Sequence, residues 1–437
     1  VLPIAIQNFM LALVSATDAI MLGWIDQTSL SAVSLAGQVQ FVLSLFISGI
    51  AAGAGIMAAQ YWGKQDAASI EKVIPIALRT NLLFSGLFTI LAGFCPEMLM
   101  RIFTNDAPLV ASGSQYLRAV ALSYVLCGIS QVYLILLKNT GHAAVSSRIS
   151  STAVVLNIIL NAILIYGLCG APALGIRGAA YATVAARVVE LIWAYLETKK
   201  PERVRILWNR LFSSAGKILS EDFWRYTLPV LAASLVWGIA YVLYSVIMGH
   251  MGSDAVAANS ITSIAKSLLS CLIRGVSGGA GVLIGNLLGA DELEKAREYG
   301  GRLTHLAIAI GVVTGGLLML ISPAIVHFAP LTDTAAEYLQ YMLLFCGLNL
   351  MAQSVNTTVL DGIFCAGGDA KFDMQGNIGA MWCFSVPLGF LAAFWLKLPV
   401  MVVYCIVNLD EIVKLPAVYL HYKKYVWVRN ITRDIEE

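Results

Sequence analysis

Long apolar stretches recur along the whole chain and are separated by short polar breaks. Each stretch holds about 20 residues or more, which is enough for an α-helix to cross a hydrocarbon layer roughly 30 Å thick. The pattern therefore predicts an all-α integral membrane protein with twelve transmembrane helices. The expected helices lie at residues 2–24, 32–60, 71–94, 113–138, 147–168, 174–197, 223–249, 255–287, 296–321, 335–364, 372–395 and 399–422.

The only extended polar stretch between these helices runs from Thr198 to Asp222 and is rich in Lys, Arg and Ser. It falls at the middle of the chain, with six predicted helices on either side. We therefore expect an N-terminal lobe at residues 1–198, a cytoplasmic linker at 199–222, and a C-terminal lobe with a cytoplasmic C-terminus at 223–437.

The second half of the chain repeats the first at an offset of about 226 residues, as the glycine pairs below illustrate. Because each copy spans an even number of helices, both copies enter the membrane in the same orientation. The halves are then related by a pseudo-two-fold axis along the membrane normal, which is one of the repeat plans of transporters. Glycines four residues apart let helices approach closely, and we expect that packing role rather than a ligand role. Matching positions include Pro3 and Pro229, Gly49 and Gly275, Gly53 and Gly279, and Gly55 and Gly281.

Positive residues are distributed unevenly between the two sides of the predicted helices. The chain has 28 Lys and Arg residues, and the loops on one side hold only Arg101, Arg118, Arg177 and Lys397. Since positive residues stay on the cytoplasmic side, we expect both termini and the linker in the cytoplasm. A multi-pass protein of a prokaryotic plasma (inner) membrane is predicted. Because the chain enters an apolar run directly after Val1, we also expect residues ahead of it.

Composition agrees with a protein that lies almost entirely in lipid. Hydrophobic residues make up 59% of the chain and charged residues 12%, whereas soluble domains carry roughly 25% charge. Eight cysteines form no C-x-x-C pair and five histidines form no H-E-x-x-H motif. We therefore expect no enzyme, no metal centre other than a transported ion, no cofactor and no nucleic-acid partner.

Several local motifs stand out: Asp18-Ala-Ile-Met-Leu-Gly23, Gln60-Tyr-Trp-Gly63, Asn286-Leu-Leu-Gly289, Asn157-Ile-Ile-Leu-Asn161, Gly178-Ala-Ala-Tyr-Ala-Thr183, and Gly367-Gly-Asp369 with Glu411 and Lys414. Together they resemble the multidrug and toxic compound extrusion (MATE) transporters, most closely their DinF-like branch. The resemblance implies two six-helix lobes around a central cavity. It also implies alternating access and export of cationic, often aromatic drugs, driven by inward Na⁺ or H⁺.

The resemblance also implies where the coupling cation binds. In the DinF-like branch the matching positions are Asp18, Asn157, Asn161 and Thr183, and the family's acid is replaced here by the amide of Asn161. A glutamate that serves the C-terminal lobe in another branch is replaced by Trp237. We therefore expect the coupling site, with a possible Na⁺, in the N-terminal lobe.

Ionisable residues at membrane depth are costly, so each is a functional candidate unless a partner explains it. Arg187 and Glu190 stand at i and i+3 and can pair, which leaves Asp18 without a positive partner. A carboxylate beside amide and hydroxyl oxygens can coordinate Na⁺, or it can protonate, since burial favours its neutral form. Both alternatives remain open.

The second half carries three positive and three negative groups at matching predicted depths. They are expected to form a charged network that either holds the lobe together or serves as a proton relay or substrate anchor. Lys414 follows Asp410 by four residues and Glu411 by three, so these three share one helix face. The six residues are Lys266, Arg274, Asp361, Asp410, Glu411 and Lys414.

Aromatic residues Trp237, Tyr241 and Tyr244 lie along one helical stripe that either packs or stacks on flat cations. The expected partners are small organic cations and membrane lipid, and we expect a monomer. A lipid-linked oligosaccharide flippase is the alternative function, although it would need an arginine-rich cavity.

Overall fold

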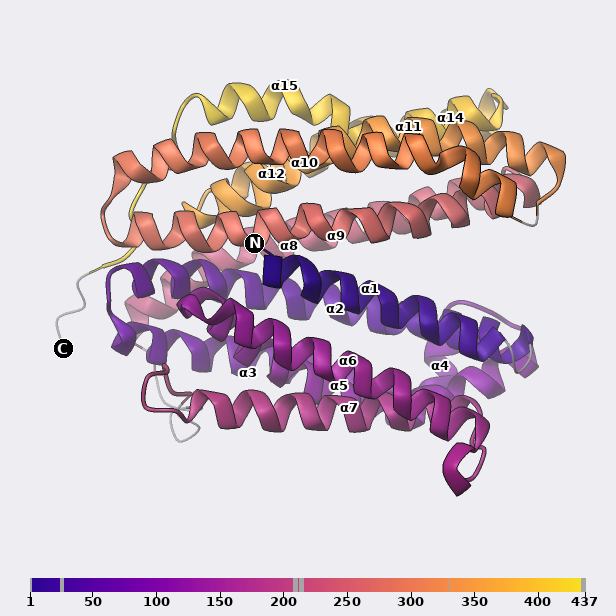
Figure 1. The fold of residues 1–437 in the computed structure, drawn as a ribbon, viewed down its shortest axis with the longest axis horizontal. Coiled ribbons are helices and arrows are strands. Elements are labelled where there is room, and N and C mark those ends of the chain that lie inside the picture. The colour runs from indigo at the N-terminus through magenta and orange to yellow at the C-terminus, as the bar shows by residue number, and fades with distance from the viewer. Residues whose placement is uncertain (1, 24–26, 207–210, 212–215, 330, 434–437) are drawn as a thin grey trace. The chain divides into compact units, whose positions relative to one another are not determined.

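The computed structural model describes residues 2–23, 27–206, 211, 216–329 and 331–433. It does not describe the side chains of residues 15, 16, 18–20, 23 and 27. Every regular element in these ranges is helical, as Figure 1 shows. The predicted all-α membrane fold is confirmed, and each of the twelve predicted spans has a helical counterpart.

The described part of the first half contains six long helices and three short helical segments. Their bounds are α1 (Leu2–Gly23), α2 (Gln27–Gly63), α3 (Ala67–Phe94), the short α4 (Pro96–Arg101), α5 (Ala107–Leu137), η1 (Lys138–His142), α6 (Ala143–Tyr166), the short η2 (Leu168–Gly170) and α7 (Ile176–Thr198). The η1 turn joins α5 to α6 across a kink at Thr140 and Gly141, where Gly141 has a φ of 81°. Glycine adopts this left-handed backbone without the steric cost that other residues carry.

The second half also contains six spans, and the last one is interrupted. The bounds are α8 (Lys217–Gly249), α9 (Ser253–Gly289), α10 (Leu293–Phe328), α11 (Asp333–Thr357) with η4 (Thr358–Phe364), α12 (Ala370–Asn377) with η5 (Ile378–Ser385), α13 (Val386–Phe390) and η6 (Leu391–Trp395), and α14 (Val400–Val407) with α15 (Asp410–Tyr422). In the described ranges, nine helical stretches are long and apolar enough to cross a membrane, and the one at Ala107–Tyr166 holds both α5 and α6.

The last predicted helix, 399–422, is broken at Asn408 and Leu409. The Asn408 side chain donates to Tyr404 O at 3.0 Å, and its own carbonyl accepts from Asn349 Nδ2 at 2.6 Å. The Asn349 amide thus satisfies the Asn408 carbonyl, which the interruption releases from the helix. The break lies directly before Asp410 and Glu411, so it fixes where these acids begin α15.

The chain folds into two compact units whose contents differ from the predicted lobes at the edges. The N-unit contains Phe9–Leu231, and the C-unit joins Val1–Asn8 to Ala232–Asp434. The N-unit therefore includes the first part of α8, and the C-unit includes the first part of α1.

Close glycine contacts explain this exchange of helix starts. A Cβ added to Gly49 would lie 2.9 Å from Leu231 Cα, and one added to Gly275 would lie 2.7 Å from Ala5 Cα. Gly49 and Gly275 are 226 residues apart, and so are their partners Ala5 and Leu231. The two contacts are therefore equivalent in the repeat. Gly53 makes a similar approach to Thr227. The predicted packing role of these glycines is confirmed.

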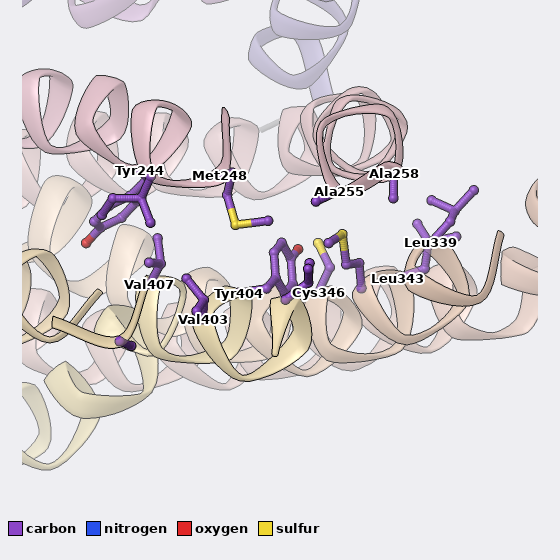
Figure 2. Close-up of a cluster of buried hydrophobic side chains, with 14 of the residues drawn as sticks. Tyr244, Met248, Ala255, Ala258, Leu339, Leu343, Cys346, Val403, Tyr404 and Val407 are labelled. Atoms are coloured by element: carbon purple, nitrogen blue, oxygen red, sulfur yellow. The ribbon is translucent and has the colours of Figure 1, made fainter. Parts of the chain in front are cut away.

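Each unit has its own apolar core. The N-unit core gathers buried side chains of α2, α4, α5 and α7, including Leu43, Met100 and Leu117. In the C-unit, Figure 2 shows Met248, Leu343, Tyr404 and their neighbours from α8, α9, α11 and α14 facing one another. These cores fix the helices from which the polar side chains described next project.

Candidate coupling and substrate site

A chain of neutral polar side chains links α6 to α7 in the N-unit. Asn161 Nδ2 donates to Asn157 Oδ1 at 3.2 Å, and Asn157 Nδ2 donates to Thr183 Oγ1 at 3.3 Å. Asn157 and Asn161 are buried, 5% and 0% exposed. The close helix approach that permits these bonds occurs at Gly178, where any Cβ would collide with the Leu164 carbonyl. Three of the four predicted coupling residues therefore form one hydrogen-bonded group, which we call the Asn157 set (Asn157, Asn161 and Thr183).

The fourth predicted residue, Asp18, belongs to α1, but its side chain lies outside the described residues. The end of α6 nevertheless contacts this part of α1, because the Tyr166 hydroxyl donates to Met21 O at 2.7 Å. Met21 follows Asp18 by three residues, so this part of α1 lies next to the helix that carries Asn157 and Asn161.

The predicted ion pair of the first half is present. Arg187 Nη1 lies 2.7 Å from Glu190 Oε2, and Ser130 Oγ donates to Glu190 Oε1 at 2.7 Å. Because both carboxylate oxygens accept charge-assisted or hydroxyl hydrogen bonds, the buried Glu190 is neutralised without help from the Asn157 set. We therefore assign a structural role in the N-unit to the ion pair of Arg187 and Glu190.

The C-unit encloses a cluster of buried charges centred on Lys414. Its Nζ lies 3.2 Å from Glu411 Oε1 and 3.5 Å from Asp410 Oδ2, and it donates to Asn377 Oδ1 at 3.1 Å. Asp410, Glu411 and Lys414 are 6%, 9% and 5% exposed. The ion pairs expected from the i+3 and i+4 spacing on α15 are therefore present.

Two further elements complete the cluster with residues that sequence reasoning missed. Asn356, in α11, donates through Nδ2 to Glu411 Oε2 at 2.8 Å and to the Glu411 carbonyl at 2.6 Å. Asp373, in α12, accepts from Asn377 Nδ2 at 3.1 Å. The i, i+4 spacing of Asp373 and Asn377 was the available signal.

Lys266, in α9, donates to the amide of Asn349 at 3.1 Å rather than to a carboxylate. Asn349 in turn holds the interrupted end of α14 through its bond to Asn408 O. Lys266 remains within electrostatic reach of Asp410 and Glu411. It therefore joins the cluster through an amide and not through direct contact.

Asp361 and Arg274 are both exposed, and in the described part of the chain they form no ion pair or hydrogen bond with each other. Asp361 lies in the π-helical stretch η4 and is within electrostatic reach of Asp373, Glu411 and Arg274. Single π-turns within α-helices are frequent at functional sites. Asp361 is thus the exposed carboxylate of the cluster, whereas Asp373, Asp410 and Glu411 are buried.

The predicted aromatic stripe of α8 divides into two parts. The rings of Trp237 and Tyr241 stack with centroids 5.6 Å apart and an interplanar angle of 17°. Tyr241 is 41% exposed. Tyr244 is buried and points into the C-unit core beside Val407 (Figure 2). Only the first two rings therefore offer an accessible aromatic face.

The long apolar helices of the described residues define the class of a multi-pass membrane protein. A model of the MatE family matches residues 3–163 and again residues 229–391, so the chain belongs to the MatE family. The two matches begin 226 residues apart, which agrees with the offset of the repeat found in the sequence.

Relatives match over most of their length. The chain is 20% identical to the Bacillus subtilis "Uncharacterized transporter YisQ", covering 98% of this chain and 93% of that protein. It is 22% identical to "Probable multidrug resistance protein YoeA" of the same organism, covering 94% and 89%. It is 25% identical to "Probable multidrug resistance protein NorM" of Agrobacterium fabrum, covering 87% and 83%.

Solved structures share the fold. An outward-facing multidrug resistance MATE family transporter of the MOP superfamily superposes with a TM-score of 0.87 at 20% identity, covering 97% of this chain and 94% of that one. A MOP superfamily transporter from Pyrococcus furiosus, described by the reverse polarity of its binding pocket, gives the same score, identity and coverage.

Proposed function

We propose that this protein exports small organic cations, often planar and aromatic, in exchange for Na⁺ or H⁺ by alternating access. The names of several relatives support drug export, since they are probable multidrug resistance proteins. The proposal places the protein in the inner membrane as a monomer with both termini in the cytoplasm.

The observation that carries the proposal is the hydrogen-bonded set of Asn157, Asn161 and Thr183 inside an apolar unit. Burying neutral polar groups costs free energy unless each finds a partner. Amide and hydroxyl oxygens are hard ligands suited to Na⁺, and they also accept a hydrogen bond from a protonated carboxyl group. We assign the binding of the cation or proton to Asp18, which belongs to α1, the helix that contacts the end of α6 at Met21.

Coupling then follows from linkage. An ion drives a conformational change only if it binds the two facing states with unequal affinity. A buried carboxylate whose charge is met by a cation in one state and by water in the other provides this inequality. The driving ion and the exported cation thereby alternate, which is the thermodynamic basis of exchange.

The stacked pair of Trp237 and Tyr241 supports the substrate class. An aromatic face attracts a cation placed over it, and a flat cation adds stacking area. Tyr241 is partly exposed, so a planar ligand can reach it. We assign these two rings to substrate binding in the C-unit.

The experiment is dye efflux from everted vesicles under an imposed Na⁺ gradient and then under an imposed pH gradient. Asp18→Asn should fold and lose gradient-driven efflux, because the amide keeps the shape but cannot titrate. Asp106→Asn is the matched control, since Asp106 is exposed and caps no helix through its side chain. Wild-type efflux rates in Asp18→Asn would refute the assignment.

Membrane topology is tested separately. A cysteine at the exposed position Glu202, in the linker, should resist a membrane-impermeant thiol reagent added outside intact cells. Labelling there from outside would contradict cytoplasmic termini, since an even number of spans places the linker and both ends on one side.

The flippase is the second candidate, and exposed Arg274 in α9 is the observation that favours it. Arg274 forms no ion pair with the residues that the structure describes, and a guanidinium group can bind phosphate oxygens. Arg274→Gln should abolish binding of a lipid-linked pyrophosphate sugar if that function holds, and should leave efflux of cationic dyes intact if it does not.

A further inference from the structure

The Lys414 ammonium group makes three polar contacts inside the C-unit, which matches its three hydrogens. Two contacts go to the carboxylates of Asp410 and Glu411, and one goes to Asn377 Oδ1. These are oxygens of the kind that bind Na⁺. The side chain of Lys414 therefore occupies the space that a bound metal cation would need.

Charged groups face this cluster from α15, α12, η4 and α9, whereas α11 contributes amides. The acids are Asp410 and Glu411 of α15, Asp373 of α12 and Asp361 of η4, and the bases are Lys414 of α15 with Lys266 and Arg274 of α9. Tyr244 of α8 also faces Asp410 and Glu411. Among the described residues that face the cluster, four carboxylates against three cations leave one excess negative charge.

A buried amide oxygen points to a missing hydrogen-bond donor at the same place. Asn356 is 1% exposed and uses its Nδ2 to hold Glu411. Its Oδ1 has no hydrogen-bond partner in the part of the chain that the structure describes. A buried acceptor without a donor is costly, and a protonated carboxyl group is one donor that would satisfy it.

We propose that Lys414 sets the ion selectivity of the C-unit: its ammonium group takes the place of a metal cation, so the cluster exchanges a proton and does not bind Na⁺. This inference rests on the proposed cation-coupled transport but concerns a site separate from Asp18. The proton passes from a hydronium ion to a carboxylate oxygen of the cluster, forming an O–H bond and releasing water. The reverse step returns it to water on the other side.

Thermal unfolding with and without Na⁺ tests the proposal on purified protein. All variants carry Asp18→Asn, which removes any Na⁺ response of the N-unit, and choline replaces Na⁺ at constant ionic strength. The Asp18→Asn protein should have the same Tm in both salts. Adding Lys414→Gln opens the oxygen set, so Na⁺ should raise the Tm by about 2 °C or more.

Lys200→Gln is the matched control, because Lys200 also follows a glutamate by three residues and pairs with it at 2.8 Å, at an exposed position. Its Tm should not respond to Na⁺. A Na⁺ response in Asp18→Asn alone, or none in folded Asp18→Asn/Lys414→Gln, would overturn the proposal. Neither result bears on efflux by the wild-type protein, so the proposed function is judged separately.

A second measurement covers the case in which Lys414→Gln yields no folded protein. Proton uptake by the Asp18→Asn protein is titrated from alkaline to acidic pH in sodium chloride and in choline chloride. Identical uptake curves are expected, since Na⁺ has no access to the carboxylates. A curve displaced to lower pH by Na⁺ would mean that the two ions compete, and would refute the role of Lys414.

Discussion

The two units share a repeated scaffold but enclose different chemistry. Gly49 in the N-unit and Gly275 in the C-unit make equivalent close contacts, 226 residues apart. At the same offset, Lys266 and Arg274 of α9 correspond to Gln40 and Ser48 of α2, and Tyr244 corresponds to Asp18. The positions that determine helix packing are conserved between halves, whereas the polar positions have diverged.

Because the polar positions differ, mutations in the N-unit and in the C-unit should have different consequences. The Asn157 set of the N-unit consists of neutral groups, so removing one of them leaves no uncompensated charge. The C-unit cluster holds Asp410, Glu411 and Lys414 in mutual contact, and removing one charge leaves the others buried without compensation. We therefore expect the N-unit set to control transport and the C-unit cluster to control both folding and ion choice.

The largest expected effect is on folding, from Lys414→Ala. Losing the ammonium strands Asp410 and Glu411, and breaking a buried ion pair costs about 3–5 kcal/mol. Unfolding of purified protein, followed by a thiol probe or by circular dichroism, measures the loss. Lys200→Ala should cost about 1 kcal/mol or less, because exposed pairs contribute little.

A double variant sharpens this result. Lys414→Ala with Glu411→Ala should recover part of the lost stability, since one stranded charge is removed with its partner. Lys266→Ala should lower the free energy of unfolding less than Lys414→Ala, because Lys266 donates to the amide of Asn349 and not to a carboxylate. Equal losses for Lys414→Ala and Lys200→Ala would mean that the cluster is not held by charge.

Replacing a close-packed glycine should lower stability by a similar amount in both units, because these glycines belong to the shared scaffold. Gly49→Leu and Gly275→Leu, at equivalent positions of the repeat, each place a side chain against a backbone that already lies within contact distance. Overpacking of this kind costs about 1–3 kcal/mol. Gly316→Leu is the control, because nothing lies within 4 Å of a Cβ at Gly316. The yield and Tm of folded protein give the comparison.

Apolar runs were sufficient to predict twelve helices, because a lipid environment leaves few alternatives for a long apolar segment. They did not predict the short α4, or the break at Asn408 and Leu409. The break depends on Asn349, which is distant in the sequence and caps the released carbonyl. The pattern of apolar residues does not encode that kind of contact.

Side-chain pairing was predictable only where it is local. The spacing on one helix gave the pairs of Lys414 with Asp410 and Glu411, and that of Arg187 with Glu190. Partners contributed by other helices, such as Asn356 and Asp373, depend on tertiary packing. The exchange of helix starts between units depends on it as well.

Asn161→Asp tests whether the N-unit can be made to resemble a charged site. A second carboxylate beside the Asn157 set should strengthen Na⁺ binding and lower the Na⁺ concentration for half-maximal efflux roughly tenfold, equivalent to about 1.4 kcal/mol. Asn81→Asp places an acid on a buried amide of α3 and serves as the control. An unchanged or weaker Na⁺ dependence in Asn161→Asp would show that the set does not contact the ion.

The smallest expected effect concerns the aromatic pair, and it separates substrate binding from ion coupling. Trp237→Ala removes one ring of the stack with Tyr241, and an exposed cation–π contact contributes about 0.5–1 kcal/mol. Affinity for a planar cationic dye, measured by fluorescence titration, should therefore fall about two- to fivefold, and Trp237→Phe should restore most of it. Trp395→Ala is the control, because that ring is 84% exposed and belongs to the same unit. The ion dependence of efflux should stay at wild-type values in all three variants, since no charge is altered. An equal loss of affinity in Trp395→Ala, or a changed ion dependence in Trp237→Ala, would contradict the separate roles of the aromatic pair and the charged cluster.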